Sequence, residues 1–150
     1  MNKSLLFLAF FLFVFIGFQP AKAQLAQSPK EFFGFEPGSD GNLFDYNQLI
    51  AYFRQLDEAS PRVQMREIGE SPMGKKMYMV FISSPKNLEK LDHYKDINRR
   101  LALDWQLRDA QRDSLVAENR VFVLATLSMH SNEVGPTQAA PQIAYTLANT

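Results

Sequence analysis

The sequence predicts an α/β protein in which a layered mixed sheet is flanked by helices. An apolar pattern of helical period begins near Asp45, and two β-rich runs separated by a turn follow it. Further along, a nearly all-apolar run at residues 121–127 precedes another helical pattern. Helices that alternate with strands along a chain favour a sheet with helices on its faces.

The composition limits the classes of function. The chain has 150 residues, which corresponds to one domain or less. It contains no cysteine, which excludes disulfides and thiolate metal sites. Basic and acidic residues balance at 16 each, and no nucleic-acid motif is present, so we expect no nucleic-acid partner.

Residues 1–23 have the layout of a secretory signal peptide. Lys3 precedes an apolar run from Leu5 to Phe18, and Ala21-Lys22-Ala23 suits cleavage after Ala23. The alternative is a membrane anchor, but the run is shorter than the roughly 20 apolar residues that a span needs. No cysteine follows the run, which argues against a lipid anchor. We therefore expect a secreted or periplasmic protein without a stable membrane anchor.

The first elements of the mature chain are an aromatic-rich segment, a helix and a hairpin. Residues 24–42 contain Pro, Gly and three phenylalanines, and we expect an extended segment that packs through its rings. A helix is predicted from Asp45 to Ser60, with Gln48 completing a capping box. Its expected apolar stripe is Tyr46, Leu49, Ile50, Phe53 and Leu56. Residues 62–69 and 75–84 then predict a β-hairpin around a Gly- and Pro-containing turn.

The second half of the chain predicts a helix, a buried strand and a final helix. The helix covers Asn87 to about Leu103, and the polar residues 104–119 form a helical or irregular piece. His93 has no acidic or histidine partner at a clear ligand spacing and is interpreted as a surface histidine. Residues 121–127 predict a central strand buried on both faces. The final helix starts at Pro136 or, because an internal proline disturbs a helix, near Pro141. Its expected apolar stripe is Ala139, Ala140, Ile143, Ala144 and Leu147.

His130 and Glu133 follow the predicted central strand directly. Imidazole and carboxylate are good zinc ligands, and a catalytic zinc site uses three protein ligands and one open position. A His-x-x-Glu pair is a weak motif by itself, and neither H-E-x-x-H nor H-x-x-E-H is present. The alternative is a polar loop in which Glu133 benefits from the helix dipole and His130 only forms hydrogen bonds. The local sequence leaves both interpretations open.

Three segments in order resemble the zinc carboxypeptidase family, the carboxypeptidase A/B-like metallopeptidases. "YNQLIAYFRQLDEASPRV" is similar to the opening helix of that family. "EIGESPMGKKMYMVFIS" resembles its strand, Gly-x-Ser-x-x-Gly turn and second strand, with Lys75-Lys76 where Arg-Pro is common. "LSMHSNEVGPTQAA" resembles its His-x-x-Glu zinc segment. The resemblance covers the chain from about Asp45 to Thr150.

This resemblance implies an α/β/α fold, a bound Zn²⁺ and hydrolysis at the carboxyl end of peptides by zinc-activated water. It implies that His130 and Glu133 are two of three zinc ligands in a His₂Glu set. The third ligand, a histidine, and the general-base glutamate of the family lie further along than residue 150, and no histidine follows His130. We therefore expect residues 24–150 to be the N-terminal part of a catalytic domain that is incomplete and inactive alone.

The zinc segment departs from the family pattern beside its ligands. Many members have an arginine before the ligand glutamate, where this chain has Asn132, and Met129 and Ser131 replace small residues. Two other functions therefore stay open: a relative that binds a peptide or glycan without cleaving it, and an envelope-associated domain unrelated to zinc. The latter predicts that the side chains of His130 and Glu133 point apart. Substrate preference and oligomeric state have no signal in the sequence.

Overall fold

The computed structural model describes residues 26–150, so the predicted signal peptide of residues 1–23 lies outside the described residues. Eight elements follow one another: α2 (Pro29–Phe33), α3 (Tyr46–Ala59), β1 (Val63–Glu70), β2 (Lys76–Ile82), α4 (Pro85–Glu89), α5 (Leu91–Leu103), α6 (Asp109–Glu118) and α7 (Val134–Ala148). Helices thus combine with a small sheet, as the α/β prediction requires. Within this described part, no helix has the length and apolarity needed to cross a membrane.

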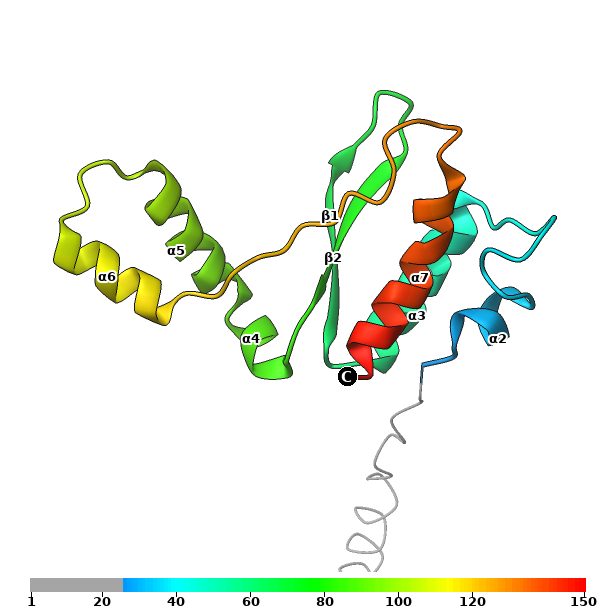
Figure 1. Ribbon diagram of the computed structural model, residues 1–150, viewed down its shortest axis with the longest axis horizontal. Helices are drawn as coiled ribbons and strands as arrows, with labels where there is room; N and C mark the ends of the chain where they lie inside the picture. Colours follow the sequence, from blue (N-terminus) through cyan, green and yellow to red (C-terminus); the bar gives the residue numbers. More distant parts are fainter. Residues whose placement is uncertain (1–25) are drawn as a thin grey trace, which may run out of the picture.

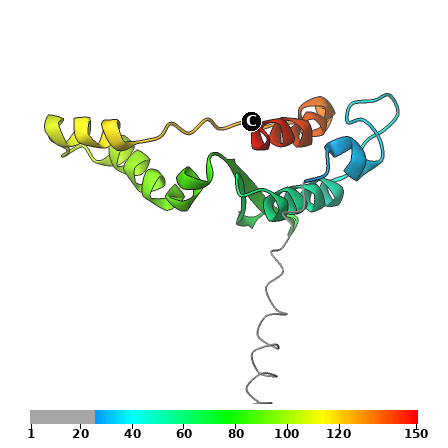
Figure 2. The same cartoon turned by 90° about the horizontal axis from the view of Figure 1, so that it is seen from below.

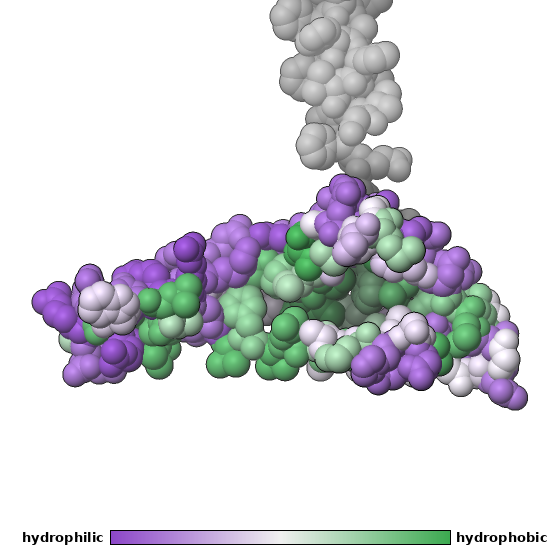
Figure 3. All heavy atoms as spheres, turned by 90° about the horizontal axis from the view of Figure 1, so that it is seen from above, coloured by the Kyte–Doolittle hydropathy of each residue, from purple (hydrophilic) through white to green (hydrophobic). Residues whose placement is uncertain are grey.

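The helices and the hairpin form two layers with an arm. The hairpin and α3 lie side by side, and α7 lies over them beside α2 (Figures 1 and 2). The helices α5 and α6 form an arm that projects away from these layers (Figure 1). Apolar side chains line the hollow between the layers (Figure 3). The core therefore lies where α7 faces α3 and the hairpin.

The core combines large side chains of α3 with small side chains of α7. Tyr52 and Leu56 of α3 are fully buried, and they cluster with Val63, Ala144 and Ala148. Alanines on α7 allow the two helices to approach closely, which brings the large side chains into contact with many atoms. The predicted stripe of α3 contains Leu56 but not Tyr52, so the sequence pattern placed the buried face of α3 partly wrong.

The aromatic segment before α3 is not simply extended, as predicted, because it contains the short helix α2. Ser28 caps this helix in a capping box with Glu31, and Gly34 ends it with a left-handed backbone at φ 77°. The rings nevertheless pack on the body as expected. Phe33 stacks on Phe44 at a centroid distance of 4.3 Å, and Phe32 meets Tyr52 edge-on.

Two predicted elements, the α3 cap and the hairpin, are confirmed. The side chain of Asp45 accepts the backbone N–H of Gln48, and the side-chain oxygen of Gln48 accepts the backbone N–H of Asp45. The strands β1 and β2 pair antiparallel, with Val63 opposite Ile82 and an irregularity between Glu67 and Gly69. They form a two-stranded sheet within residues 26–150.

The predicted helix from Asn87 to Leu103 is interrupted at Lys90. The backbone angles of Lys90 are not helical, so the segment forms two helices, α4 and α5. Leu91, Tyr94 and Ile97 form the buried face of α5. His93 is partly exposed, as expected for a surface histidine, but it has an acidic partner that its spacing did not reveal. Its Nε2 lies 2.7 Å from Oε1 of Glu118 on α6.

The predicted central strand at residues 121–127 is not a strand in the structure. The segment runs as an extended connection from the arm to α7 (Figure 1), and the exposed fractions of Val121 and Val123 are 89% and 92%. A strand forms only where a neighbour supplies backbone partners. Among the described residues, no strand lies beside this run. Its backbone groups therefore lack the partners that a strand needs, despite the β propensity of its residues.

The final helix differs from its prediction in start and in buried face. It begins at Val134, Pro136 lies in its first turn, and it continues through Pro141. A proline at this position removes one backbone hydrogen bond without ending the helix. Ala140, Pro141, Ala144 and Ala148 are buried, whereas Ile143 and Leu147 of the predicted stripe are exposed.

A buried glutamine ties α7 to the loop before α3. The amide of Gln138 donates to the carbonyl of Phe44 at 3.0 Å and accepts the N–H of Phe44 at 3.3 Å. Both groups are buried, and the two bonds satisfy a backbone donor and a backbone acceptor that would otherwise lack partners. The loop of residues 37–43 is thereby held against the first turns of α7.

The core predicts that Leu56→Ala destabilises the protein strongly. Removing this fully buried side chain loses apolar burial and leaves a cavity, which costs about 2–5 kcal/mol of the free energy of unfolding. Urea unfolding of the full-length protein measures it, and the exposed Leu103→Ala serves as the matched control. Equal stability of the two variants would contradict this account of the core.

The buried glutamine gives a second prediction. Gln138→Ala leaves the N–H and carbonyl of Phe44 without partners, so the free energy of unfolding should fall by about 1–3 kcal/mol. The control is Gln142→Ala, since Gln142 lies on the same helix but is exposed. The free energy of unfolding should change by no more than about 0.5 kcal/mol in Gln142→Ala. A similarly small change in Gln138→Ala would show that the two hydrogen bonds from Gln138 to Phe44, the Gln138 clamp, do not stabilise the fold.

Candidate metal centre

The loop that carries His130 and Glu133 is shaped by its own hydrogen bonds. Ser128 has a positive φ of 105°, which is uncommon for a residue other than glycine. Its hydroxyl lies 3.2 Å from the carbonyl oxygen of His130 and 2.9 Å from that of Glu133. At the start of α7, the hydroxyl of Thr137 donates to the carbonyl of Leu127 at 3.0 Å. These contacts close the loop on itself.

The side chains of His130 and Glu133 point toward each other. Nδ1 of His130 lies 2.7 Å from Oε1 of Glu133. The other carboxylate oxygen, Oε2, accepts the backbone N–H groups of Met129 and His130, each at 3.1 Å. The convergence contradicts the expectation of the zinc-unrelated interpretation, in which the two side chains point apart. It suits both the polar-loop interpretation and a pair of ligands.

These hydrogen bonds determine the charge of the carboxyl group. The bond from the His130 side chain, followed by the backbone N–H groups of His130 and Met129, lowers the pKa of Glu133 below its usual value. Each bond stabilises the ionised form, and burial opposes them only weakly. Glu133 is therefore a carboxylate at neutral pH, with the charge state that a metal ligand needs.

His130 and Glu133 have the donor atoms and the solvent exposure that two ligands of a zinc site need. An imidazole nitrogen and a carboxylate oxygen are common zinc donors, and 67% and 45% of the two side chains are exposed. Two donors on a tetrahedral zinc are about 3.3 Å apart. The observed 2.7 Å between Nδ1 and Oε1 is a hydrogen-bond distance, so the two atoms would have to separate by roughly half an ångström before both could bind one zinc ion.

The described residues supply only this pair. Within residues 26–150, no three His, Asp, Glu or Cys side chains are grouped closely enough to share a metal ion. The other histidine, His93, pairs with Glu118 on the arm of α5 and α6, away from α7 (Figure 1). The structure thus brings the two predicted ligands together and places no third donor beside them in its described part.

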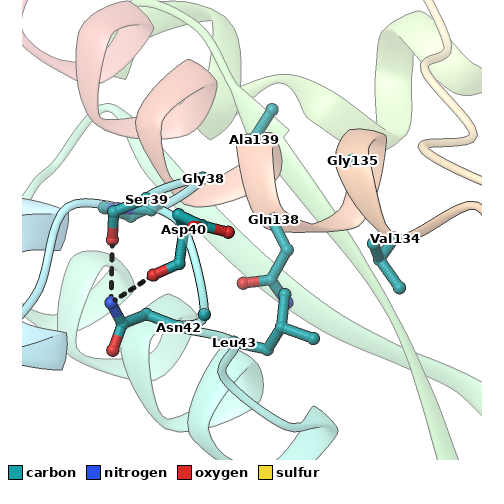
Figure 4. A pocket seen from close by; sticks show the side chains of 11 residues that line it. Gly38, Ser39, Asp40, Asn42, Leu43, Val134, Gly135, Gln138 and Ala139 are labelled. Carbon is teal, nitrogen blue, oxygen red and sulfur yellow. Dashed lines mark hydrogen bonds between the residues drawn. The ribbon is translucent and has the colours of Figure 1, made fainter.

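A pocket begins at the residue that follows Glu133. It has a volume of about 460 Å³ and lies between the loop of residues 37–43 and the first turns of α7 (Figure 4). Val134, Gly135, Gln138 and Ala139 line it on the helix side. The sequence pattern does not reveal this pocket, although the run Pro37-Gly38-Ser39-Asp40-Gly41-Asn42 has a clear turn composition.

Ser128 and Gln138 are two further residues that the sequence reasoning missed. Ser128 shapes the His130 loop through contacts with two carbonyls, and a positive φ at a serine has no signal in composition. Gln138 looks like an ordinary polar residue of a helix surface. Its burial follows from the packing of α7, which the helical period alone did not predict.

Comparison with known proteins identifies the family. A model of the zinc carboxypeptidase family matches residues 49–150, which is well over half of the chain and includes most of α3, both strands and the loop with His130 and Glu133. No curated protein and no solved structure matches the chain. The family match agrees with the resemblance of the three sequence segments. The chain therefore belongs to the zinc carboxypeptidase family.

Proposed function

We propose that the protein is a secreted zinc-dependent metallocarboxypeptidase that hydrolyses C-terminal peptide bonds, with His130 and Glu133 as two of the protein ligands of Zn²⁺. Membership in the family implies a hydrolase that acts on peptides and uses zinc. The residue assignment is supported by the family match, which covers this loop, together with the 2.7 Å approach of Nδ1 of His130 and Oε1 of Glu133. In this proposal, residues 1–23 are the signal peptide and residues 24–150 are the N-terminal part of the catalytic domain.

The proposed roles follow from the donors and their supports. A bound zinc ion would lower the pKa of a water molecule and polarise the carbonyl of the scissile bond. His130 and Glu133 hold the metal, and the Ser128 contacts keep their backbone in place. Ligands positioned by a second layer of hydrogen bonds bind metal more tightly than free side chains do.

The remaining ligand and the general base are part of the same proposal. Catalytic zinc sites use three protein ligands, and residues 26–150 hold two candidates together. We assign the third ligand and the base to parts of the protein other than these described residues. Two donors alone bind zinc weakly, so the proposal ties catalysis to assembly of the whole site.

One observation favours a second candidate function, a relative that binds a peptide or glycan without cleaving it. Asn132, which is exposed beside Glu133, stands where many family members have an arginine. A neutral amide cannot replace the charge that a guanidinium offers to a substrate carboxylate. In this case the pocket and the fold would serve binding, and the protein would show no peptide turnover.

Metal content and turnover test the proposal directly. Full-length protein should contain about one zinc ion per chain and release C-terminal residues from peptides. His130→Ala and Glu133→Ala should each lower zinc content and reduce activity at least about 100-fold, more than the loss of a supporting contact costs. Zinc is measured by elemental analysis and turnover by mass spectrometry of a peptide library.

The chain offers a matched control for each variant. His93→Ala and Glu118→Ala remove the same two side chains from the surface pair on the arm, and they should leave zinc content and turnover unchanged. Zinc binding and turnover that survive at both His130→Ala and Glu133→Ala would refute the ligand assignment. Peptide binding without turnover in the wild type would select the non-catalytic alternative.

A further inference from the structure

A second cavity lies on the side of α3 that faces away from α7. It has a volume of about 600 Å³ and is formed by α3 and the start of β2. Tyr46, Ile50 and Arg54 line it from the helix. Because successive residues turn by about 100° around a helix, this face is opposite the one that carries Tyr52 and Leu56 in the core. The α3–β2 cavity is therefore separate from the candidate metal centre.

Two side-chain bridges hold the helix wall against the strand wall. The hydroxyl of Tyr46 donates to the backbone carbonyl of Lys76. Nη2 of Arg54 donates to the hydroxyl of Tyr78 at 2.9 Å, and its guanidinium carbon lies 5.7 Å from the centre of that ring. A site whose walls are fixed before binding loses less entropy when a ligand arrives.

The cavity has more positive than negative charge. Arg54, Lys75 and Lys76 line it together with one acid, Glu58. Lys76 already pairs with two glutamates of β1, at 2.8 and 2.5 Å. In the part of the chain that the structure describes, no ion pair includes Arg54, Lys75 or Glu58. Arg54 and Lys75 therefore carry charges that no carboxylate of these residues neutralises.

The hydrogen-bond donors of the cavity are still available. An arginine has five N–H donors, and the bond of Arg54 to Tyr78 uses Nη2 alone. The hydroxyl of Tyr78 accepts this bond and keeps its own proton to donate. The side chain of Lys75 is exposed, whereas its backbone is held by Ser71 through bonds of 2.8 and 3.1 Å. Donors and cations thus line one opening between helix and strand.

We propose that the α3–β2 cavity binds a ligand through an oxyanion group, a phosphate or a carboxylate. The guanidinium of Arg54 contacts two oxygens of the group, and the ammonium of Lys75 supplies a second positive charge. The planar fork of an arginine matches the oxygens of both groups, and charge-assisted hydrogen bonds are stronger than neutral ones. This site is independent of zinc and of peptide hydrolysis.

Equilibrium dialysis of the full-length protein tests the site with two probes, radiolabelled inorganic phosphate and radiolabelled glutarate. The wild type should bind at least one probe saturably, and the probe that binds more tightly identifies the oxyanion. Arg54→Gln and Lys75→Gln should each weaken that probe about three- to fivefold, as for an exposed ion pair. Both side chains are exposed, so the fold should tolerate the changes, which thermal unfolding verifies.

Matched variants separate the cavity from general charge attraction and from the metal centre. Arg99→Gln and Lys86→Gln remove the same charges from exposed positions on α5 and α4, and they should leave probe affinity unchanged. Absence of saturable binding in the wild type would overturn the proposal, as would equal losses in the cavity and control variants. A probe whose binding is lost in His130→Ala but unchanged in Arg54→Gln would also overturn it, because that probe binds at the metal centre.

Discussion

The position of α7 depends on its packing against α3, and the candidate site depends on the position of α7. Ala144 and Ala148 let the helix approach Tyr52 and Leu56, which are fully buried beneath it. Glu133 immediately precedes α7, and Gln138 lies one turn into the helix. The same contact therefore places the carboxylate, the clamp on Phe44 and the wall of the pocket. A shift of α7 along α3 would move all three together.

Among the described residues, no strand supports the loop that carries the candidate ligands. Residues 121–127 connect the arm to α7 as an exposed segment, and its two ends are held by side chains. Asn98 donates to the carbonyl of Arg120 at 3.2 Å, and Thr137 donates to that of Leu127 at 3.0 Å. Sites on rigid elements are positioned more accurately than sites on loops. Here the hydrogen bonds of Ser128 and Glu133 within the loop help to position the candidate ligands.

Features that depend on local chemistry were predictable from the sequence, and features that depend on partners were not. Asp45 with Gln48 and the Gly74 turn of the hairpin need only neighbouring residues, and both were found. The buried face of α7 depends on what covers it, so Ile143 was misplaced and Gln138 was missed. Residues 121–127 have the composition of a central strand, but strand formation needs a paired neighbour. The proximity of His130 and Glu133 was predictable because the two residues are three positions apart at a turn.

The two oxygens of Glu133 have different partners, and this division bears on the proposed role. Oε2 accepts two backbone N–H groups of the loop, whereas Oε1 faces the imidazole of His130. A rotation of the imidazole would free Oε1 and a ring nitrogen together, while Oε2 would keep the carboxylate in place. The backbone bonds also maintain the ionised form after the imidazole turns away, since they independently lower the pKa of Glu133. A carboxylate anchored by one oxygen and open at the other is prepared for a ligand role, because little ordering remains when the metal binds.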